Sequence, residues 1–451
     1  MAGAGKTAED STRPTILSVS PSDGATGIPI TTSITATFSE AMNPTSINDT
    51  TFTIAGAAGS VSYADTTATL TPSADLAYGT TYTATVTTGV KDATGNSMAA
   101  DYIWSFTTRP PPGSLDVTFG TAGTVTTAIG SGNDEIHALG IQADGKIVVA
   151  GYARVGANDD FALARYNPNG TLDTSFGSAG TVTTFLSSGE DHANALGIQA
   201  DGKIVVAGWA SNGANYVFAL ARYLTDGKLD TTTFGTAGTV TTTIGITSFA
   251  NALGIQADGK IVVAGSSSNG INNVFALARY TATGATDTTF GSAGITTTTI
   301  SGDSDAVNAL GIQSDGKIVA AGNSFSALMY FALARYTVTG ALDTTFGFAG
   351  ITTTSIGMNC AANALGIQSD GRIVTDGYTH NGANYDFALA RYLTNGAMDP
   401  SFGSAGTVTI ALSSGDDYAR ALGIQGDVKI VAAGWSLGGT DIDFALVRYW
   451  P

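Results

Sequence analysis

Aspartates recur at one fixed position in the loops of a repeated unit. Each stands six residues before a repeated glycine: Asp134, Asp191, Asp305 and Asp417. Carboxylate oxygens are hard ligands of the kind that Ca²⁺ prefers, so a ring of these loops is a candidate calcium site. Ca²⁺ is the one cofactor that the sequence suggests. The alternative is that each aspartate forms hydrogen bonds within its own loop and that no cofactor is bound.

Aromatic residues recur directly after the Val-Ala-Gly strand of the same units. Two tryptophans and two tyrosines share this position: Trp209, Trp435, Tyr152 and Tyr378. Aromatic rings on one rim of a protein can stack on sugar rings. The same rings could instead cover the ends of strands. These four residues are the candidates for ligand contacts.

Groups suited to catalysis are few. The histidines are His137, His192 and His380, and His192 stands beside Glu190 and Asp191. Adjacent loop residues seldom form a working acid–base pair. No serine lies in a nucleophile elbow, and no repeated pair of carboxylates marks a glycosidase. The sequence therefore predicts no catalytic or cofactor-binding residue, and a hydrolase or lyase ranks third among the functional hypotheses.

Most cationic residues belong to the repeat. Arginines share one repeat position: Arg165, Arg222, Arg279, Arg335, Arg391 and Arg448. A second position holds Lys146, Lys203, Lys260, Lys317, Arg372 and Lys429. These residues account for 12 of the 19 lysines and arginines, and their expected partners are the equally repeated aspartates. A ring of six glutamines, from Gln142 to Gln425, would either line a channel or bond adjacent units.

Six units position these residues. The block Leu-Asp-x-x-Phe-Gly recurs with its aspartate at 116, 173, 230, 287, 343 and 399, which gives spacings of 57, 57, 57, 56 and 56. Each unit holds four strand-sized runs, and an Asp-Gly pair marks a tight hairpin between the second and third. Four antiparallel strands in 57 residues are typical of a propeller blade. We therefore predict a six-bladed β-propeller over 114–451.

The order of strands within a blade has two interpretations. In one, Ala-Leu-Gly-Ile-Gln is the innermost strand, the last blade lacks its outer strand, and residues 124–127 supply it and close the ring. In the other, Thr-Val-Thr-Thr is innermost and each blade is continuous in sequence.

The repeat resembles a known bacterial family. The blocks Leu-Asp-x-x-Phe-Gly, Asp-Gly-Lys-Ile-Val-Val-Ala-Gly and Phe-Ala-Leu-Ala-Arg-Tyr, which span 114–449, look like the delta-sixty repeat of propeller-like proteins. The resemblance implies a large exported or cell-surface protein and no agreed activity.

Residues 14–109 have a different pattern. Alternating runs such as 33–38 and 81–86 predict about seven half-buried strands separated by turn signals, as in an Ig-like β-sandwich. The stretches 20–25, 38–42 and 92–96 and the closing Trp-Ser-Phe-Thr-Thr resemble the Ig-like modules of bacterial surface-layer proteins. That resemblance implies a spacer or assembly unit. Residues 110–113 form a stiff proline-rich linker, and residues 1–13 form an extension that could be an assembly tail.

Composition limits the partners. The net charge is −17, which disfavours nucleic acid and anionic membranes. No run of 18 apolar residues predicts a membrane span, and the start of the chain carries no apolar signal core. Cys360 is the only cysteine, so no intrachain disulfide is expected.

These features predict an all-β protein that is extracellular or on the cell surface and has a structural or adhesive role. It would self-associate, or bind other surface proteins, through contacts between the Ig-like domain or tail and the propeller, and heterologous contacts of this kind can build a filament or surface layer. The alternative is a propeller module that binds carbohydrate or another ligand.

Overall fold

The chain forms two compact units in a computed structural model, residues 1–116 and 117–451. The structure describes residues 10–111, 118–425, 428–438 and 441–450. Most of the predicted tail and half of the predicted linker lie outside these ranges. The described residues are organised as β-strands, with one short 3-10 turn at Pro44–Ser46. The fold is all-β, as the sequence predicts.

The first unit is a sandwich of two four-stranded sheets. One sheet has the order β1-β3-β6-β5 and the other β2-β8-β7-β4. The strands are β1 (Ile16–Ser20), β2 (Ala25–Ile28), β3 (Ile34–Phe38), β4 (Phe52–Ile54), β5 (Gly59–Ala64), β6 (Thr67–Pro72), β7 (Thr81–Val86) and β8 (Tyr102–Thr108). Alternate residues of β3 are fully buried, as a two-residue period requires. Trp104 and Phe106 of β8 pack in the core between the sheets.

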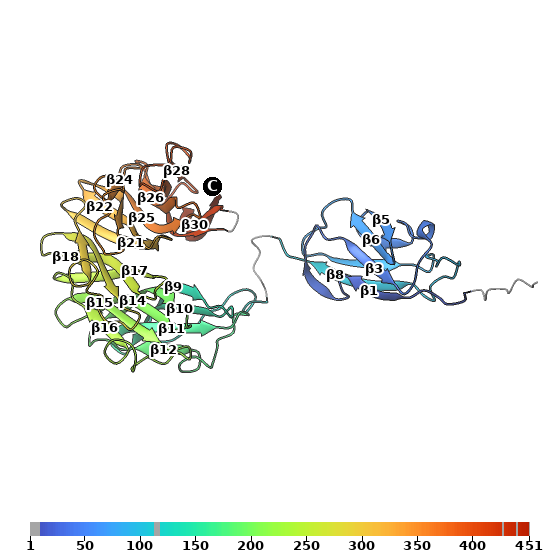
Figure 1. The fold of residues 1–451 in the computed structure, drawn as a ribbon, viewed down its shortest axis with the longest axis horizontal. Coiled ribbons are helices and arrows are strands. Elements are labelled where there is room, and N and C mark those ends of the chain that lie inside the picture. Colours follow the sequence, from blue (N-terminus) through green and yellow to red (C-terminus); the bar gives the residue numbers. More distant parts are fainter. Residues whose placement is uncertain (1–9, 112–117, 426–427, 439–440, 451) are drawn as a thin grey trace, which may run out of the picture. The chain divides into compact units, whose positions relative to one another are not determined.

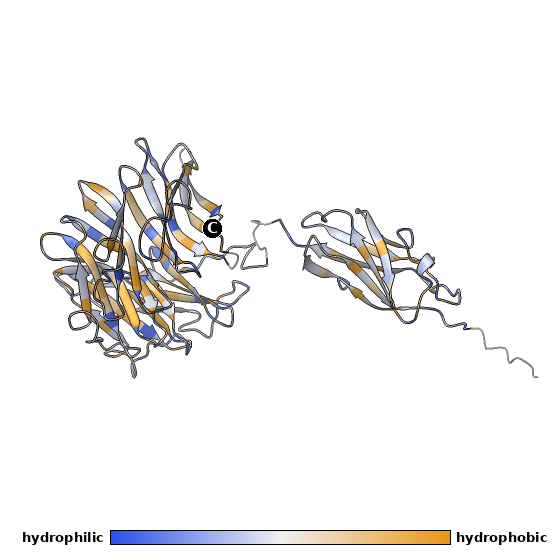
Figure 2. Ribbon diagram, turned by 45° about the horizontal axis from the view of Figure 1, so that its top comes forward, coloured by the Kyte–Doolittle hydropathy of each residue, from blue (hydrophilic) through white to orange (hydrophobic). Residues whose placement is uncertain are grey.

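The second unit is a series of groups of antiparallel strands, one group for each repeat, and we number these groups sheets 1 to 6. A single parallel pair, Asn273 with Ser304, joins sheets 3 and 4 into one eight-stranded sheet. Sheets 1 to 3 are β9 (Asp134–Ile141), β10 (Ile147–Val155), β11 (Asn158–Tyr166), β12 (Thr181–Thr184); β13 (Asp191–Ile198), β14 (Ile204–Ser211), β15 (Tyr216–Tyr223), β16 (Thr239–Thr242); and β17 (Thr247–Ile255), β18 (Ile261–Ser268), β19 (Asn273–Tyr280), β20 (Ile295–Thr298). Sheets 4 to 6 are β21 (Ser304–Ile312), β22 (Ile318–Ser326), β23 (Leu328–Tyr336), β24 (Ile351–Thr354); β25 (Cys360–Ile367), β26 (Ile373–His380), β27 (Tyr385–Tyr392), β28 (Thr407–Ile410); and β29 (Asp417–Ile424), β30 (Ile430–Gly438), β31 (Asp441–Tyr449). These repeated sheets are those of a β-propeller. Figure 2 shows that strands of both units carry many of the hydrophobic residues.

Glycine makes the tight hairpins of the repeat possible. Gly145, which follows Asp144, has φ +81°, a conformation that glycine adopts without steric cost. In sheet 6, where the order of these residues differs, Val428 takes φ +61° instead. A β-branched residue is strained there.

The Ala-Leu-Gly-Ile-Gln strand is the innermost of each sheet, which decides between the two interpretations of strand order. Strands β9, β13, β17, β21, β25 and β29 contact one another in succession, and β17, β21 and β25 lie toward the middle of the array (Figure 1). The strands of a sheet then follow outward in sequence order.

At each interface between consecutive sheets, a glycine of one inner strand faces the side chains of the next inner strand. A Cβ placed on Gly254 would lie 2.7 Å from Leu310 and 2.9 Å from Ile312 of the next sheet. The leucine and isoleucine side chains of the next sheet thus occupy the space that a Cβ would take. The same contact recurs at Gly140, Gly197, Gly311 and Gly366. The hydrophobic core is thus divided into clusters, most of which join two consecutive sheets.

The two ends of the array differ from its interior. Sheet 6 has three described strands with β31 at its edge, and residues 124–127 form no strand. The prediction that these residues complete the last blade is therefore wrong for this structure. Figure 1 shows sheets 1 and 6 at the two ends of the array.

Candidate functional site

An aromatic stack lies at one rim of sheets 1 and 2. The Tyr152 ring stacks on His192 at a centroid distance of 4.0 Å, and His192 stacks on Trp209 at 4.3 Å. Tyr216 and Phe249 extend the group through edge contacts with Trp209. We call these five residues the first aromatic cluster. All are partly exposed.

The first cluster carries an ionic network. His192 Nε2 lies 3.2 Å from Asp159 Oδ2, and Arg154 Nη1 lies 3.0 Å from Asp159 Oδ1 and 3.9 Å from Glu190. Burial lowers the pKa of His192 although Asp159 opposes the shift. The hydrogen bond from Tyr152 lowers the pKa of Glu135.

Asp159, Glu190 and His192 are close enough together to share a metal ion, since one ligand atom of each lies within 4.8 Å of the others. The Arg154 guanidinium already pairs with both carboxylates, and a cation would have to displace it. The stacked rings also cover both faces of His192. This arrangement favours a fixed structural role for the histidine over metal binding or proton transfer.

A second aromatic cluster occupies the same position in sheets 5 and 6. Tyr418 stacks on Trp435 at 4.5 Å and contacts Tyr378 at 4.5 Å and Tyr385 at 5.1 Å. The four predicted contact residues therefore divide into two clusters: Tyr152 and Trp209 in the first, Tyr378 and Trp435 in the second. In sheets 3 and 4 the same position holds Ser266 and Asn323, so the repeat does not require an aromatic residue there.

The candidate calcium ligands bind their own loops. Asp191 is fully buried and accepts hydrogen bonds from the amides of Leu186 and Ser187 at 3.0 and 2.9 Å. Asp134, Asp305 and Asp417 accept equivalent bonds five residues upstream, at 2.8, 2.8 and 2.7 Å. Among the described residues, none of the four belongs to a group of three candidate metal ligands. These hydrogen bonds are the ones expected if each aspartate bonds the backbone of its own loop.

In sheets 1 to 5 the repeated cations pair with the repeated aspartates, as predicted. Arg279 Nε lies 2.8 Å from Asp287 Oδ2, and Lys260 lies 3.3 Å from the same oxygen. The Arg279 guanidinium also lies 4.6 Å from the Phe290 ring centroid. Hydrogen bonds from Thr289, together with Arg279 and Lys260, outweigh desolvation and lower the pKa of Asp287 to about 2.

The repeated amides also join sheets to one another. Gln256 accepts from Arg279 at 3.5 Å and donates to Gly316 O of the next sheet at 3.4 Å. Asn251 donates to Val307 O of the next sheet at 2.8 Å. Gln256 therefore fits the interpretation in which the glutamines bond adjacent units, and the asparagine makes a second bond of this kind.

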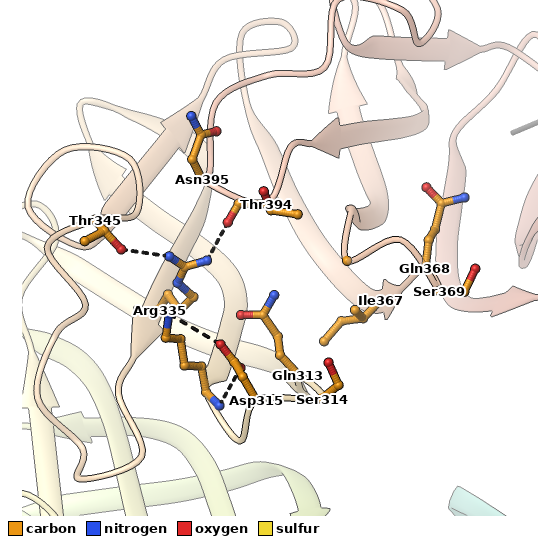
Figure 3. A pocket seen from close by; sticks show the side chains of 12 residues that line it. Gln313, Ser314, Asp315, Arg335, Thr345, Ile367, Gln368, Ser369, Thr394 and Asn395 are labelled. Carbon is orange, nitrogen blue, oxygen red and sulfur yellow. Dashed lines mark hydrogen bonds and ion pairs between the residues drawn. The ribbon is translucent and has the colours of Figure 1, made fainter.

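A polar cavity of about 610 Å³ lies between sheets 4 and 5. Figure 3 shows Arg335 hydrogen-bonded to Thr345 and Thr394 at its wall, with Gln313 and Gln368 nearby. Arg335 is also paired with Asp343. Its charge is thus already compensated within the protein, and the cavity offers no free guanidinium for an anion.

Sequence reasoning missed Asp376. It lies in β26 where five other units have alanine, at 150, 207, 264, 321 and 433. It is fully buried, and neither carboxylate oxygen makes a hydrogen bond of normal geometry within the described residues. The break in the repeat pattern was the signal that would have found it.

Comparison with known proteins identifies both units. Residues 10–108 match a bacterial Ig-like domain. Five segments, 142–176, 199–232, 256–290, 313–346 and 368–402, match a β-propeller domain of unknown function (DUF5122). No curated protein matches the chain. Among the described residues, no helix is long and apolar enough to cross a bilayer.

Solved structures give weaker similarity. Sqt1 from Chaetomium thermophilum is 12% identical, with 67% of each chain covered and a TM-score of 0.34. A gluconolactonase from Xanthomonas campestris is 12% identical, with 72% of this chain and 99% of that chain covered and a TM-score of 0.33. An arabinanase from Bacillus subtilis is 15% identical, with 56% and 91% covered and a TM-score of 0.32. The family matches carry the identification: the chain joins an N-terminal bacterial Ig-like domain to a β-propeller repeat region.

Proposed function

We propose that this chain is a structural and adhesive protein of the bacterial cell surface. In this proposal the Ig-like domain is a spacer and the propeller makes the contacts. The match of residues 10–108 to a bacterial Ig-like domain supports the location, because such domains are typical of bacterial surface proteins.

The observation that carries the adhesive role is the pair of aromatic clusters. Their residues are specific to certain sheets and partly exposed, whereas Ser266 and Asn323 serve the same position elsewhere. Aromatic residues are enriched where proteins contact one another. Residues that the fold does not need, gathered at one rim, are therefore the best candidates for contact with a partner.

A ligand-binding propeller is the second candidate function, and the same clusters favour it. Carbohydrate is the ligand class that stacks on aromatic rings. In the first cluster, however, the inner ring faces already cover one another. A sugar would have to use the outermost rings or the ring edges.

Location is tested on intact cells that express the full chain. An antibody against the Ig-like domain should label unbroken cells, and labelling that appears only after lysis would reject the proposed location.

Contact is tested with the purified full chain on a glycan array and on immobilised cell-surface proteins of the same bacterium. Trp209→Ala and Trp435→Ala should weaken binding, while Phe348→Ala, at a residue 89% exposed and outside the clusters, should not. Binding to glycans alone would favour the second candidate. Equal binding by all three variants would reject a role for the rim.

A further inference from the structure

The cavity between sheets 4 and 5 lies where these two units depart from the repeat. The hairpins 313–317 and 368–372 line it, and each contributes a serine directly after the repeated glutamine, Ser314 and Ser369 (Figure 3). In sheets 1 to 3 this position holds alanine, at 143, 200 and 257, and in the sixth unit it holds glycine. The fold of a unit therefore does not need a hydroxyl there, and the two hydroxyls that occur line the same cavity.

Both hydroxyls can reach a ligand. Ser314 and Ser369 are exposed, and within the described part of the chain neither hydroxyl has a hydrogen-bond partner. A serine hydroxyl can donate one hydrogen bond and accept others. The cavity thus receives one unused hydroxyl from each of the two sheets.

Two amide oxygens at the same cavity lack a donor. Gln313 Oε1 and Gln368 Oε1 are shielded from solvent and have no hydrogen-bond partner among the described residues. In sheets 1 to 3 the equivalent oxygens accept from the repeated arginine of their own sheet, at 3.5, 3.3 and 3.5 Å. A buried acceptor without a donor is unfavourable. Because both glutamines line the cavity, a small rotation of either amide would let its oxygen accept from a ligand.

The charges at the cavity wall compensate one another. The two cations are Lys317 and Arg335, and Asp343 lies 3.2 Å from the first and 2.9 Å from the second. Asp315 lies 3.4 Å from Lys317 Nζ as well. Two carboxylates thus balance two cations, so that a charged ligand would have to break an existing ion pair.

The remaining lining residues favour a ligand rich in hydroxyl groups. They are serine, threonine, asparagine and glutamine side chains together with Ile367 and Gly371, and no aromatic residue is among the described residues that line the cavity. A nucleobase or another flat aromatic ligand would have no ring to stack on, whereas hydroxyl and amide groups match the donors and acceptors of a sugar. The cavity volume of about 610 Å³ lies in the range of small-molecule sites, about 300–1,000 Å³.

We propose that this cavity binds a neutral carbohydrate of one or two sugar rings, with Ser314 and Ser369 holding its hydroxyl groups from the two sheets. The ligand also supplies donors to the amide oxygens of Gln313 and Gln368, and its ring carbons lie against Ile367. Recognition at this site depends on hydrogen bonds rather than on ring stacking.

Serine-to-alanine variants of the full chain test the site. Ser314→Ala and Ser369→Ala install the residue that sheets 1 to 3 use, so neither change should alter the fold, which thermal unfolding would verify. Calorimetric titration uses glucose, galactose, mannose, N-acetylglucosamine, maltose, cellobiose and lactose as probes. At least one should bind the wild type saturably. Loss of one neutral hydrogen bond should weaken that binding about threefold in each single variant and about tenfold in the double variant.

Controls separate the hydroxyl contacts from general effects. Ser292→Ala changes an exposed serine of sheet 3 outside the cavity and should bind the saccharide like the wild type. Calcium chloride and sodium phosphate are the charged probes, and neither should displace the saccharide. Displacement by either one would contradict a site for neutral ligands.

Hydrogen–deuterium exchange locates the bound saccharide. Its addition should protect the backbone amides of 313–317 and 368–372. The proposal is wrong if none of the saccharides binds, if the double serine variant keeps wild-type affinity, or if protection appears only at the aromatic clusters.

This cavity lies apart from both aromatic clusters, so the inference and the proposed function fail separately. Trp209→Ala and Trp435→Ala should bind the saccharide like the wild type. Binding that these two variants lose and the double serine variant keeps would overturn the cavity site and favour carbohydrate binding by the clusters.

Discussion

Replacing Asp376 with asparagine should remove a pH-dependent loss of stability from the interface between sheets 5 and 6. Val374 packs against sheet 6, and side chains two residues apart share a face, so Asp376 faces sheet 6 as well. Few hydrogen-bonding groups serve this interface. Among the described residues, the Tyr449 hydroxyl also has no hydrogen-bond partner. In other sheets a threonine bonds the equivalent tyrosine, as Thr354 bonds Tyr392, but Ile410 stands at that position here.

The size of the effect follows from the carboxyl's burial. Loss of hydration raises the pKa of Asp376 from 3.8 to about 7, and the backbone amide of Ala364 offsets only part of this. The shift corresponds to an upper bound of about 4 kcal/mol at about 1.4 kcal/mol per pKa unit. The unfolded chain loses this proton near pH 3.8 and the folded chain near pH 7, so the stability contribution is full below pH 3.8. It then declines until about pH 7 and stays constant above that.

Denaturant unfolding between pH 3 and 8 measures this contribution. The difference in unfolding free energy between wild type and Asp376→Asn should change by up to about 4 kcal/mol between pH 4 and 7. Aspartates with lowered pKa, such as Asp287, are present in both proteins and cancel in the difference. Asp376→Ala, which restores the residue of the other sheets, should be more stable than wild type at pH 8. Parallel pH profiles for wild type and Asp376→Asn would refute the reasoning.

Two further predictions concern the interfaces between sheets. Gly254→Ala should lower the free energy of unfolding by about 1–3 kcal/mol, because the new methyl group meets the leucine side chain of the next sheet at 2.7 Å. Gly423→Ala should change it by less than about 0.5 kcal/mol, because a Cβ there meets nothing within 4 Å. Thermal unfolding of dilute protein compares the two variants, and equal losses would show that the contact at Gly254 does not account for the effect. Asp287→Ala should lower the free energy of unfolding by about 3–5 kcal/mol, because it leaves the buried Arg279 charge without its carboxylate. Asp226→Ala removes an exposed ion pair and should lower it by at most about 1 kcal/mol. A similar loss in both aspartate variants, measured by urea unfolding, would show that the buried network contributes no more than a surface pair.

The repeat made much of the propeller predictable. Alternation and Asp-Gly pairs determine strands and hairpins locally, and identical units must fold alike, so the four-strand pattern followed from the residues. The pairing of repeated arginines with repeated aspartates followed for the same reason, since both occur once per unit. In the Ig-like domain, eight strands formed where about seven were predicted, because short strands such as β4 leave little signal in the sequence.

The candidate contact residues were only partly predictable. Trp209 and Tyr152 share a repeat position, which placed them on one rim. His192 reaches that stack from a different strand, and only the register of β13 against β14, which pairs His192 with Trp209, brings it there. The sequence left the role of the loop aspartates open between calcium binding and hydrogen bonds within the loop, because it shows residue types but not hydrogen-bond partners.

By itself, the sequence determined the strand pattern, the repeat number and the residues that each unit shares, because these depend on local chemistry that recurs. Only the tertiary structure decided which strand is innermost, which polar groups are already paired, and whether the two ends meet. Those outcomes depend on contacts between units far apart in the chain. In the structure the loop aspartates accept hydrogen bonds from their own loops, and the aromatic residues of the rim form two clusters. Leu139 and Leu446, which look like any other repeat leucine in the sequence, are exposed.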